Sequence, residues 1–270
     1  MRRTLIVVSC TMGLAVLASG TAGAIVYGEF DGEQHPNVGA IVADWRDPGS
    51  GNLDLFCSGT LIAPDVFLTA AHCTASLAAQ GIEPDEVFVT FDPVFDENAT
   101  LLPGVYDLNP AFGQGGANDT HDVAVIILND PAAGITPAEL PPAGLLSDLN
   151  ASGELRDTRF TAVGYGTVRE TNRRAFDAIL DNTERRFADQ QFRSLTEAWM
   201  TLSMNVSTGD GGTCYGDSGG PHFLGAGDNE TDVVASITVT GDAVCKATDK
   251  TYRMDTDSAR DYLETFVDLP

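Results

Sequence analysis

The chain has 270 residues, of which 43% are hydrophobic and 20% are charged. This composition supports a folded domain with a sizeable core and excludes disorder as the main state. Acidic residues outnumber basic ones by 39 to 15, which gives a formal net charge of −24 at pH 7. A protein that binds a phosphate backbone needs a basic face, and the lysines of this chain are Lys246 and Lys250 alone, so we expect no nucleic-acid partner.

The first 24 residues have the pattern of an export signal. Two arginines precede an apolar run over residues 5–17, and small residues end in an Ala-Gly-Ala cleavage sequence at 22–24. The run is too short for a comfortable membrane span. We predict a signal peptide over residues 1–24 and a secreted domain over residues 25–270, extracellular or periplasmic, with no membrane attachment after signal removal. A lipid anchor on Cys10 is the poorer alternative, because that cysteine lies early in the apolar run.

Four cysteines remain after the predicted cleavage, namely Cys57, Cys73, Cys214 and Cys245. An even number in an oxidising compartment indicates two disulfides, and the sequence alone allows three pairings. Metal binding is the weaker alternative, because no CxxC or HxxxH spacing occurs.

Short β-rich runs recur along the chain, separated by Gly, Pro, Asn and Asp clusters that favour turns. We predict strands at Val38–Ala43, Thr60–Ala63, Val66–Leu68, Val87–Phe91, Val123–Leu128, Phe160–Val163 and Val233–Thr240. Helical periodicity is found at Arg173–Trp199 and at Asp257–Val267, where Ser258 can cap the helix near its start. Many short strands with few helices predict an all-β sandwich or barrel.

Three short motifs carry the candidate chemistry. The first ends in His72-Cys73, the second places Asp122 before an apolar strand, and the third is the Gly216–Pro221 loop around Ser218. Each motif alone has an ordinary structural explanation, so the weight comes from all three together. A serine hydroxyl is a poor nucleophile unless a base adjoins it, and that base needs an orienting acid. We therefore predict His72 as the base, Asp122 as its orienting acid and Ser218 as the nucleophile.

The glycines around the serine let the backbone turn sharply and leave amides open to a ligand. The backbone N–H groups of Gly216 and Ser218 are the predicted donors to a developing oxyanion. The same loop fits the Gly-x-Ser-x-Gly elbow of the α/β-hydrolases, but that fold needs its acid and histidine after the serine. Only His222 follows here, so the chain order excludes the esterase alternative.

The three motifs, in the order His, Asp, Ser, resemble those of the chymotrypsin/trypsin family of secreted serine peptidases. The likeness covers roughly residues 25–267, from the Cys57–Cys73 segment through His121–Ala124 to the Gly216–Pro221 loop. It implies an all-β fold of two packed six-stranded antiparallel β-barrels with a C-terminal helix and a cleft between the barrels. It also implies a monomeric serine endopeptidase that hydrolyses protein or peptide substrates through an acyl-enzyme.

The resemblance further implies the disulfides Cys57–Cys73, beside the histidine, and Cys214–Cys245, beside the substrate pocket. Cleavage after Ala24 leaves a chain that begins Ile25-Val26-Tyr27-Gly28, which is similar to the terminus of activated family members. The resemblance implies that the new α-ammonium of Ile25 pairs with Asp217, the acid before the serine. We predict that signal peptidase itself creates this terminus.

The primary specificity follows less directly from the resemblance. In the family that the chain resembles, the residue six before the nucleophile lies at the base of the primary pocket, and an aspartate there selects Arg or Lys. Here that residue is Gly212, followed by Thr213. Thr238 and Thr240 are expected to narrow the same pocket. We therefore predict a non-tryptic preference for small or medium apolar residues.

Some alternatives stay open. Asp210 and Asp242 could substitute for the missing aspartate, and Lys250 could turn inward and favour an acidic substrate residue. No cofactor or metal is predicted, although the oxygen-rich stretch Asp85–Glu97 falls where some relatives bind calcium. The rival function is a catalytically silent binding protein on the same scaffold, but such proteins usually lose a triad residue and this chain retains all three.

Overall fold

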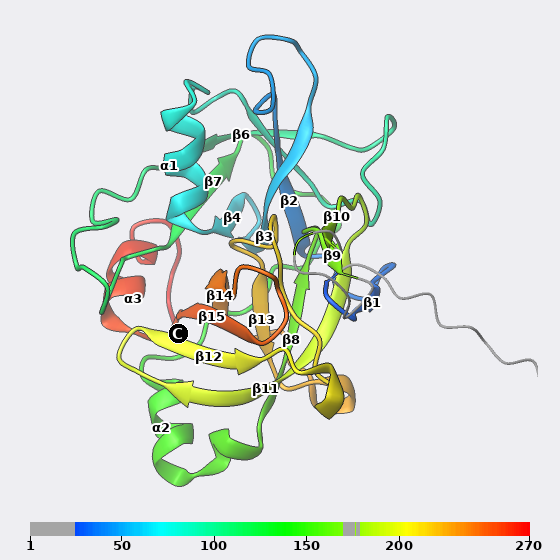
Figure 1. Cartoon of the computed structure of the whole chain (residues 1–270). Helices are drawn as coiled ribbons and strands as arrows, with labels where there is room; N and C mark the ends of the chain where they lie inside the picture. Colours follow the sequence, from blue (N-terminus) through cyan, green and yellow to red (C-terminus); the bar gives the residue numbers. More distant parts are fainter. Residues whose placement is uncertain (1–24, 170–175, 177–178) are drawn as a thin grey trace, which may run out of the picture.

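The computed structural model describes residues 25–169, 176 and 179–270. The predicted signal peptide over residues 1–24 lies outside the described residues. The described chain forms two closed antiparallel β-barrels of six strands each, as the resemblance implies, with the first barrel in the upper half of Figure 1 and the second in the lower half. The all-β fold predicted from the sequence is therefore confirmed.

The first barrel is built from the N-terminal half of the domain. In hydrogen-bonded order it contains β2 (Val38–Ala43), β3 (Asp54–Ala63), β4 (Val66–Thr69), β7 (Ala124–Leu128), β6 (Leu102–Tyr106) and β5 (Val87–Thr90), which pairs back with β2. Apolar side chains of all six strands fill its interior. Gly59 on β3 is required by this packing, because a Cβ there would overlap the ring of Phe67 and the carbonyl oxygen of Leu68.

The second barrel is closed by β8, which pairs on both of its edges. In order it contains β8 (Arg159–Gly164), β11 (Arg186–Leu195), β12 (Trp199–Ser203), β15 (Thr248–Arg253), β14 (Val234–Gly241) and β13 (Pro221–Leu224), which pairs back with β8. The short strand β1 (Glu29–Phe30) pairs with β11 and so ties the N-terminal segment to this barrel. A separate two-stranded sheet contains β9 (Val168–Arg169) and β10 (Ile179–Leu180).

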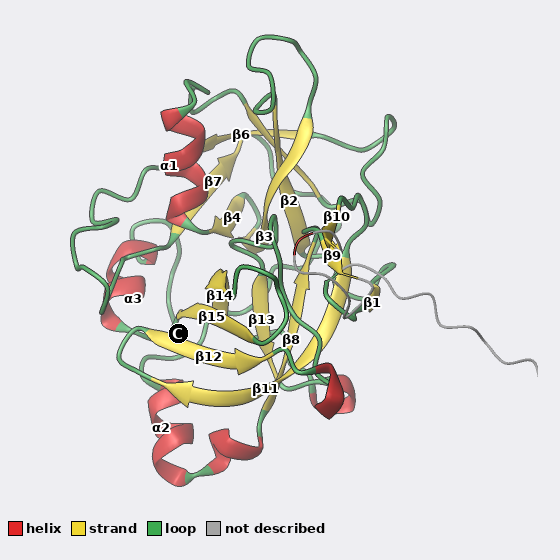
Figure 2. Ribbon diagram, viewed as in Figure 1, coloured by secondary structure: helices red, strands yellow, loops and turns green. Residues whose placement is uncertain are grey.

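Helices lie outside the barrels (Figure 2). They are α1 (Ala71–Ala79), α2 (Leu145–Ser152), α3 (Asp257–Leu263) and the short 3₁₀ helices Glu154–Asp157, Val206–Thr208 and Gly227–Asn229. The cap predicted for α3 is wrong: Thr256 Oγ1 accepts the N–H of Ala259, whereas the Ser258 hydroxyl lies 2.9 Å from that of Tyr252. In the part of the chain that the structure describes, no helix is both long and apolar enough to cross a membrane.

The helix predicted over Arg173–Trp199 is wrong wherever the structure describes that segment; residues 170–175 and 177–178 lie outside the described residues. The segment instead contributes β10, β11 and the first residue of β12. Six consecutive residues of β11, from Arg186 to Gln191, are in register with β8. This ladder closes the second barrel, and tertiary pairing of that kind outweighs a local helical preference.

Candidate active site

The predicted base and its orienting acid are in direct contact. His72 is the second residue of α1, and Asp122 lies two residues before β7, which pairs with β4. His72 Nδ1 lies 2.9 Å from Asp122 Oδ2, and the backbone N–H of His72 donates to Asp122 Oδ1 at 2.8 Å. Asp122 is buried, whereas the imidazole is about a third exposed. A carboxylate that accepts at Nδ1 places the proton there and leaves Nε2 unprotonated, as a general base requires.

The loop that carries Ser218 is held between the two barrels. The Ser58 N–H of β3 donates to the Ser218 carbonyl oxygen at 2.9 Å, and the Gly219 N–H donates to the Thr238 carbonyl oxygen of β14 at 2.8 Å. Gly216 and Gly219 have φ values of +96° and +81°, which favour glycine. The sequence GDSGG therefore supplies the turns that bring the loop across the barrel interface.

Gly219 also allows a close approach to the histidine segment. A Cβ at this position would overlap Thr69 Oγ1 and lie 2.7 Å from the N atom of Ala70, just before His72. The absence of a side chain at position 219 therefore permits the serine loop to lie against the segment that presents the base.

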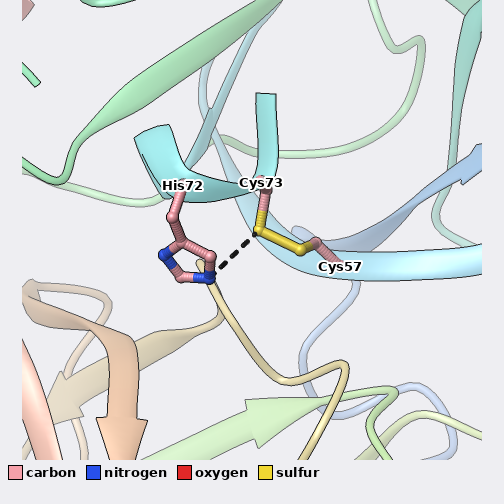
Figure 3. Close-up of side chains that lie close together, drawn as sticks. All are labelled: Cys57, His72 and Cys73. Carbon is pink, nitrogen blue, oxygen red and sulfur yellow. Dashed lines mark hydrogen bonds between the residues drawn. A yellow bond between two sulfur atoms is a disulfide. The ribbon is translucent and has the colours of Figure 1, made fainter. Parts of the chain in front are cut away.

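The disulfide between Cys57 and Cys73 joins β3 to α1 beside the histidine, as predicted (Figure 3). Cys73 Sγ lies 3.7 Å from His72 Nε2 and 3.9 Å from the carbonyl oxygen of Ser218. The imidazole of His72 and the serine loop thus both lie within 4 Å of the same sulfur atom, Cys73 Sγ. Within the described ranges, this Cys57, His72 and Cys73 group is the one that brings three potential metal ligands together, and the disulfide uses both of its sulfurs.

The second predicted disulfide, Cys214–Cys245, is also present and joins the serine loop to the segment that follows β14. The expectation of no metal, with calcium at the Asp85–Glu97 stretch as the open alternative, stays a prediction. There the Asp92 and Asp96 carboxylates accept the backbone N–H groups of Thr100 and Asn98.

Asp217, the acid before the serine, is fully buried. Its two oxygens accept the backbone N–H groups of Gly166 and Cys214, each at 2.8 Å. Burial raises the pKa of this carboxyl to about 7. Ile25 and Val26 are also fully buried, and Val26 exchanges two backbone hydrogen bonds with Gly212 at 2.7 and 3.0 Å. The predicted new terminus therefore lies beside the segment around residue 212, which precedes the serine loop.

A cavity of about 270 Å³ opens beside Ser218. Three threonines assigned to the primary pocket, Thr213, Thr238 and Thr240, contribute to its wall, with Thr240 exposed at the surface. Gly212 is not in this wall. A Cβ at that position would overlap Met204 Cγ and lie 2.7 Å from Gln190 Nε2, so these two side chains occupy the space of a residue 212 side chain.

The charged alternatives near the pocket each have partners elsewhere. Asp210 pairs with Arg159 at 2.9 Å. Asp242 lines the cavity, but its carboxylate accepts backbone N–H groups of the turn that follows it, at residues 246–248. Lys250 Nζ lies 4.0 Å from the ring centroid of Trp199, in a cation–π contact.

Two features of the site were missed from the sequence. Asp249 lies buried on β15 behind Thr213, which donates to it at 2.7 Å. A second cavity, of about 610 Å³, opens on the other side of Gly216 and includes Trp45, Phe56 and Tyr215 in its wall. Neither feature has a local motif, because each is assembled from residues of several strands and loops.

The remaining histidines lie outside the His72 site. His35 and His222 are buried. His121, next to Asp122, faces a different cavity, one that it shares with Tyr262 and Phe266 near α3.

Comparison with known proteins agrees with this geometry. The family model described as Trypsin matches residues 41–262. The chain is 30% identical over 172 residues to a trypsin of Saccharopolyspora erythraea, and the matched region covers 62% of this chain and 69% of that protein. It is 27% identical over 218 residues to the serine protease Hayan of Drosophila melanogaster, covering 72% of this chain and 32% of that protein. It is 28% identical over 172 residues to a vitellin-degrading protease of Bombyx mori, covering 61% of each. The match of the family model over most of the chain, on two closed six-stranded barrels, shows that this protein belongs to the trypsin family of serine proteases.

Proposed function

We propose that the protein is a secreted serine endopeptidase that hydrolyses peptide bonds through an acyl-enzyme. The observation that carries the proposal is the His72–Asp122 pair. The imidazole of His72 and the backbone of Ser218 both lie close to Cys73 Sγ, so the pair is beside the serine loop. Membership of a serine protease family supports the reaction class. Two disulfides and the signal-like N-terminal sequence support export to an oxidising compartment.

In this mechanism Ser218 Oγ attacks the substrate carbonyl while His72 Nε2 takes the serine proton. Asp122 holds the imidazole in place through Nδ1 and stabilises the imidazolium that forms. The backbone N–H groups of Gly216 and Ser218 stabilise the oxyanion, and His72 then protonates the leaving amine. In the second half, His72 takes a proton from a water molecule that attacks the acyl-enzyme, and it then protonates Ser218 Oγ as the leaving group.

The active form begins at Ile25 in this proposal, and the new α-ammonium pairs with Asp217. Two backbone amides hold the Asp217 carboxylate in the full chain, and neither carries the positive charge that would neutralise it. The burial of Ile25 and the Val26–Gly212 pairing support this proposal, because residue 212 precedes the serine loop by only four residues. A buried cation beside Asp217 removes the free-energy penalty of an uncompensated buried charge. Because Asp217 belongs to the serine loop, cleavage before Ile25 would in this way stabilise the conformation of that loop.

Fluorophosphonate labelling followed by intact-mass measurement tests the proposal. We expect one label on the secreted protein, absent in Ser218→Ala and retained in Ser207→Ala, which alters an exposed serine of the same barrel. The starting mass shows whether the chain begins at Ile25. Absence of label on a chain that begins at Ile25 would support the silent binding scaffold instead, whereas absence on a longer chain would indicate a zymogen.

A further inference from the structure

A groove that the proposed function leaves unused lies between α3 and the loop that joins β6 to β7 (Figure 1). The loop lines it with residues between 107 and 121, and α3 with the turn that follows it lines it with residues between 257 and 266. We call it the α3 groove. Its volume is about 670 Å³, within the range of sites that bind ligands. It shares no wall residue with the cavities beside Ser218 and Gly216, so it is a separate cavity.

Two aromatic rings and two residues of the loop form the apolar part of the α3 groove. Tyr262 and Phe266 lie with their ring centroids 5.1 Å apart and their planes tilted by 59°. The Tyr262 hydroxyl donates to Asp107 Oδ1 at 2.9 Å, which holds this ring in place. Pro110 and Ala111 line the groove from the loop, and both rings are only partly buried. The aromatic pair therefore offers an ordered apolar surface that part of a partner can cover.

The α3 groove is also negatively charged. Asp107, Asp257 and Asp261 line it, whereas no lysine or arginine does. Within the described ranges, none of these three aspartates forms an ion pair. Arg260, the basic residue of α3, donates instead to two backbone carbonyl oxygens outside the groove. Acids without a cation, beside apolar rings, favour a ligand that brings positive charge together with apolar surface.

We infer that the α3 groove binds a segment of a partner polypeptide in which lysine or arginine stands next to aromatic or aliphatic side chains. Lysine and arginine fit both parts of the groove, because their methylene stems cover apolar surface while the charged head reaches a carboxylate. The same cations are attracted to the faces of tyrosine and phenylalanine rings. A second copy of this chain is a poor occupant, since its net charge of −24 opposes contact with the three aspartates. This site is additional to the proposed peptidase site.

The α3 groove reaches the backbone that presents Asp122. Asn109 and His121 line the groove, and Asn109 Nδ2 donates to the carbonyl oxygens of His121 and Val123 at 3.1 and 2.9 Å. These two carbonyl groups flank Asp122, which accepts from His72. A partner in the groove is therefore docked beside the residue that precedes Asp122, while the cavity beside Ser218 stays open to a substrate.

Fluorescence anisotropy of labelled peptides tests the inference on Ser218→Ala, which cannot cleave the probe. The probe is a short peptide of lysine and phenylalanine spaced by serine. One counterpart replaces every lysine by glutamate, and another replaces every phenylalanine by serine. We expect both counterparts to bind at least about tenfold more weakly than the probe, and we expect the affinity of the probe to fall as salt is added. Equal affinity of either counterpart would overturn the inference.

A pair of double variants locates the binding site. Asp257→Asn with Asp261→Asn should weaken binding of the probe at least about tenfold, because two carboxylates of the groove are lost. Asp228→Asn with Asp232→Asn is the matched control, since it removes two exposed charges from the second barrel and changes the net charge equally. The control should bind the probe like Ser218→Ala alone. Equal losses in the two double variants would show that the probe responds to net charge only, and no loss in the first would place it elsewhere; either result would overturn the inference.

Blocking the serine separates the α3 groove from the proposed function. The probe should bind wild-type protein that carries the fluorophosphonate as tightly as it binds Ser218→Ala, because the groove and the cavity beside Ser218 have separate walls. Loss of binding on labelling would place the probe in the cleft and overturn the groove alone. A chain that begins at Ile25, takes no label and still binds the probe would overturn the peptidase and leave the groove in place.

Discussion

Asp122 uses both of its carboxylate oxygens on a single residue. One oxygen accepts the His72 ring N–H and the other accepts the His72 backbone N–H. The bond to the backbone N–H fixes the position of the residue, and the bond to Nδ1 fixes the rotation of its ring. If this pairing serves catalysis, a substitution of Asp122 should lower kcat, whereas the substitution of a merely structural aspartate should not.

Asp122→Asn should preserve the fold and lower kcat by about 10⁴-fold, because an amide can stabilise the wrong imidazole tautomer. The KM for a peptide substrate should change little, since Asp122 does not line the cavity beside Ser218. His121→Asn provides the matched control, because this neighbouring histidine faces a different cavity and asparagine tolerates its φ of +51°. Steady-state kinetics check both variants, and equal losses in the two would contradict the assignment of Asp122.

Residue-level prediction from the sequence was possible where the signal is local. The segments around His72, Asp122 and Ser218 each carry a motif within a few residues, and the structure brings these segments together. Asp249 has no such motif, because its hydrogen-bond partners Gln190 and Thr213 belong to other parts of the chain. The partners of a buried charge are a property of the barrel interior and cannot be found from nearby sequence.

At the scale of elements, the predicted strands lie where the structure has them, but their lengths differ. The expected run Thr60–Ala63 is the last four residues of β3, a strand of 10 residues that begins at Asp54 and pairs with β2 along most of its length. The strands β12, β13 and β15 are among those not predicted, because buried polar residues such as Ser203, His222 and Thr251 weaken the alternation of apolar and polar residues. Polar interiors of this kind hide strands from a pattern based on hydrophobicity.

The serine loop and the histidine segment form one unit only if position 219 carries no side chain. Gly219→Ala should lose about 1–2 kcal/mol of folding stability through its positive φ, and it should also lose fluorophosphonate labelling, because the new Cβ would overlap Thr69. Gly113→Ala is the matched control, with a φ of +78° and no atom within 4 Å of the added Cβ. We expect the control to lose only the stability that its positive φ costs and to keep normal labelling, whereas Gly219→Ala should lose more, because its Cβ also overlaps backbone atoms of Ser58 and Ala70. Normal labelling of Gly219→Ala would show that the close approach is not required.

At the scale of the whole molecule, a buried ionic network joins the N-terminal segment to both barrels. Arg185 donates to Asp31, to the carbonyl oxygens of Val38 and Phe91 in the first barrel, and to the hydroxyl of Tyr165, which follows β8. Asp31 also accepts from His35, which stacks on Phe223 of β13 with 5.6 Å between ring centroids. The network thus connects the segment that follows Ile25 to the body of the protein.

His35 completes this network as a cation. Burial alone would lower its pKa, but the hydrogen bonds to Asp31 and Glu230 outweigh burial and raise the pKa to about 9. Because the pKa of an unfolded histidine is about 6.5, the folded state binds this proton more tightly. The stability that the charged His35 contributes is therefore full below about pH 6.5 and is lost as the pH rises through about 9.

We therefore expect the titration of His35 to lower the free energy of unfolding by about 3 kcal/mol between pH 6 and pH 10, in addition to the smaller loss as Asp217, with its pKa of about 7, ionises in the folded state. Urea unfolding at several pH values measures this, best in the Ser218→Ala background, where self-digestion cannot distort the transition. His35→Gln should be less stable at pH 6 and should show a much flatter profile, because glutamine can donate to one acid but carries no charge. A wild-type profile and a His35→Gln profile that fall in parallel over this range would show that other groups titrate there and that the network does not depend on a charged His35.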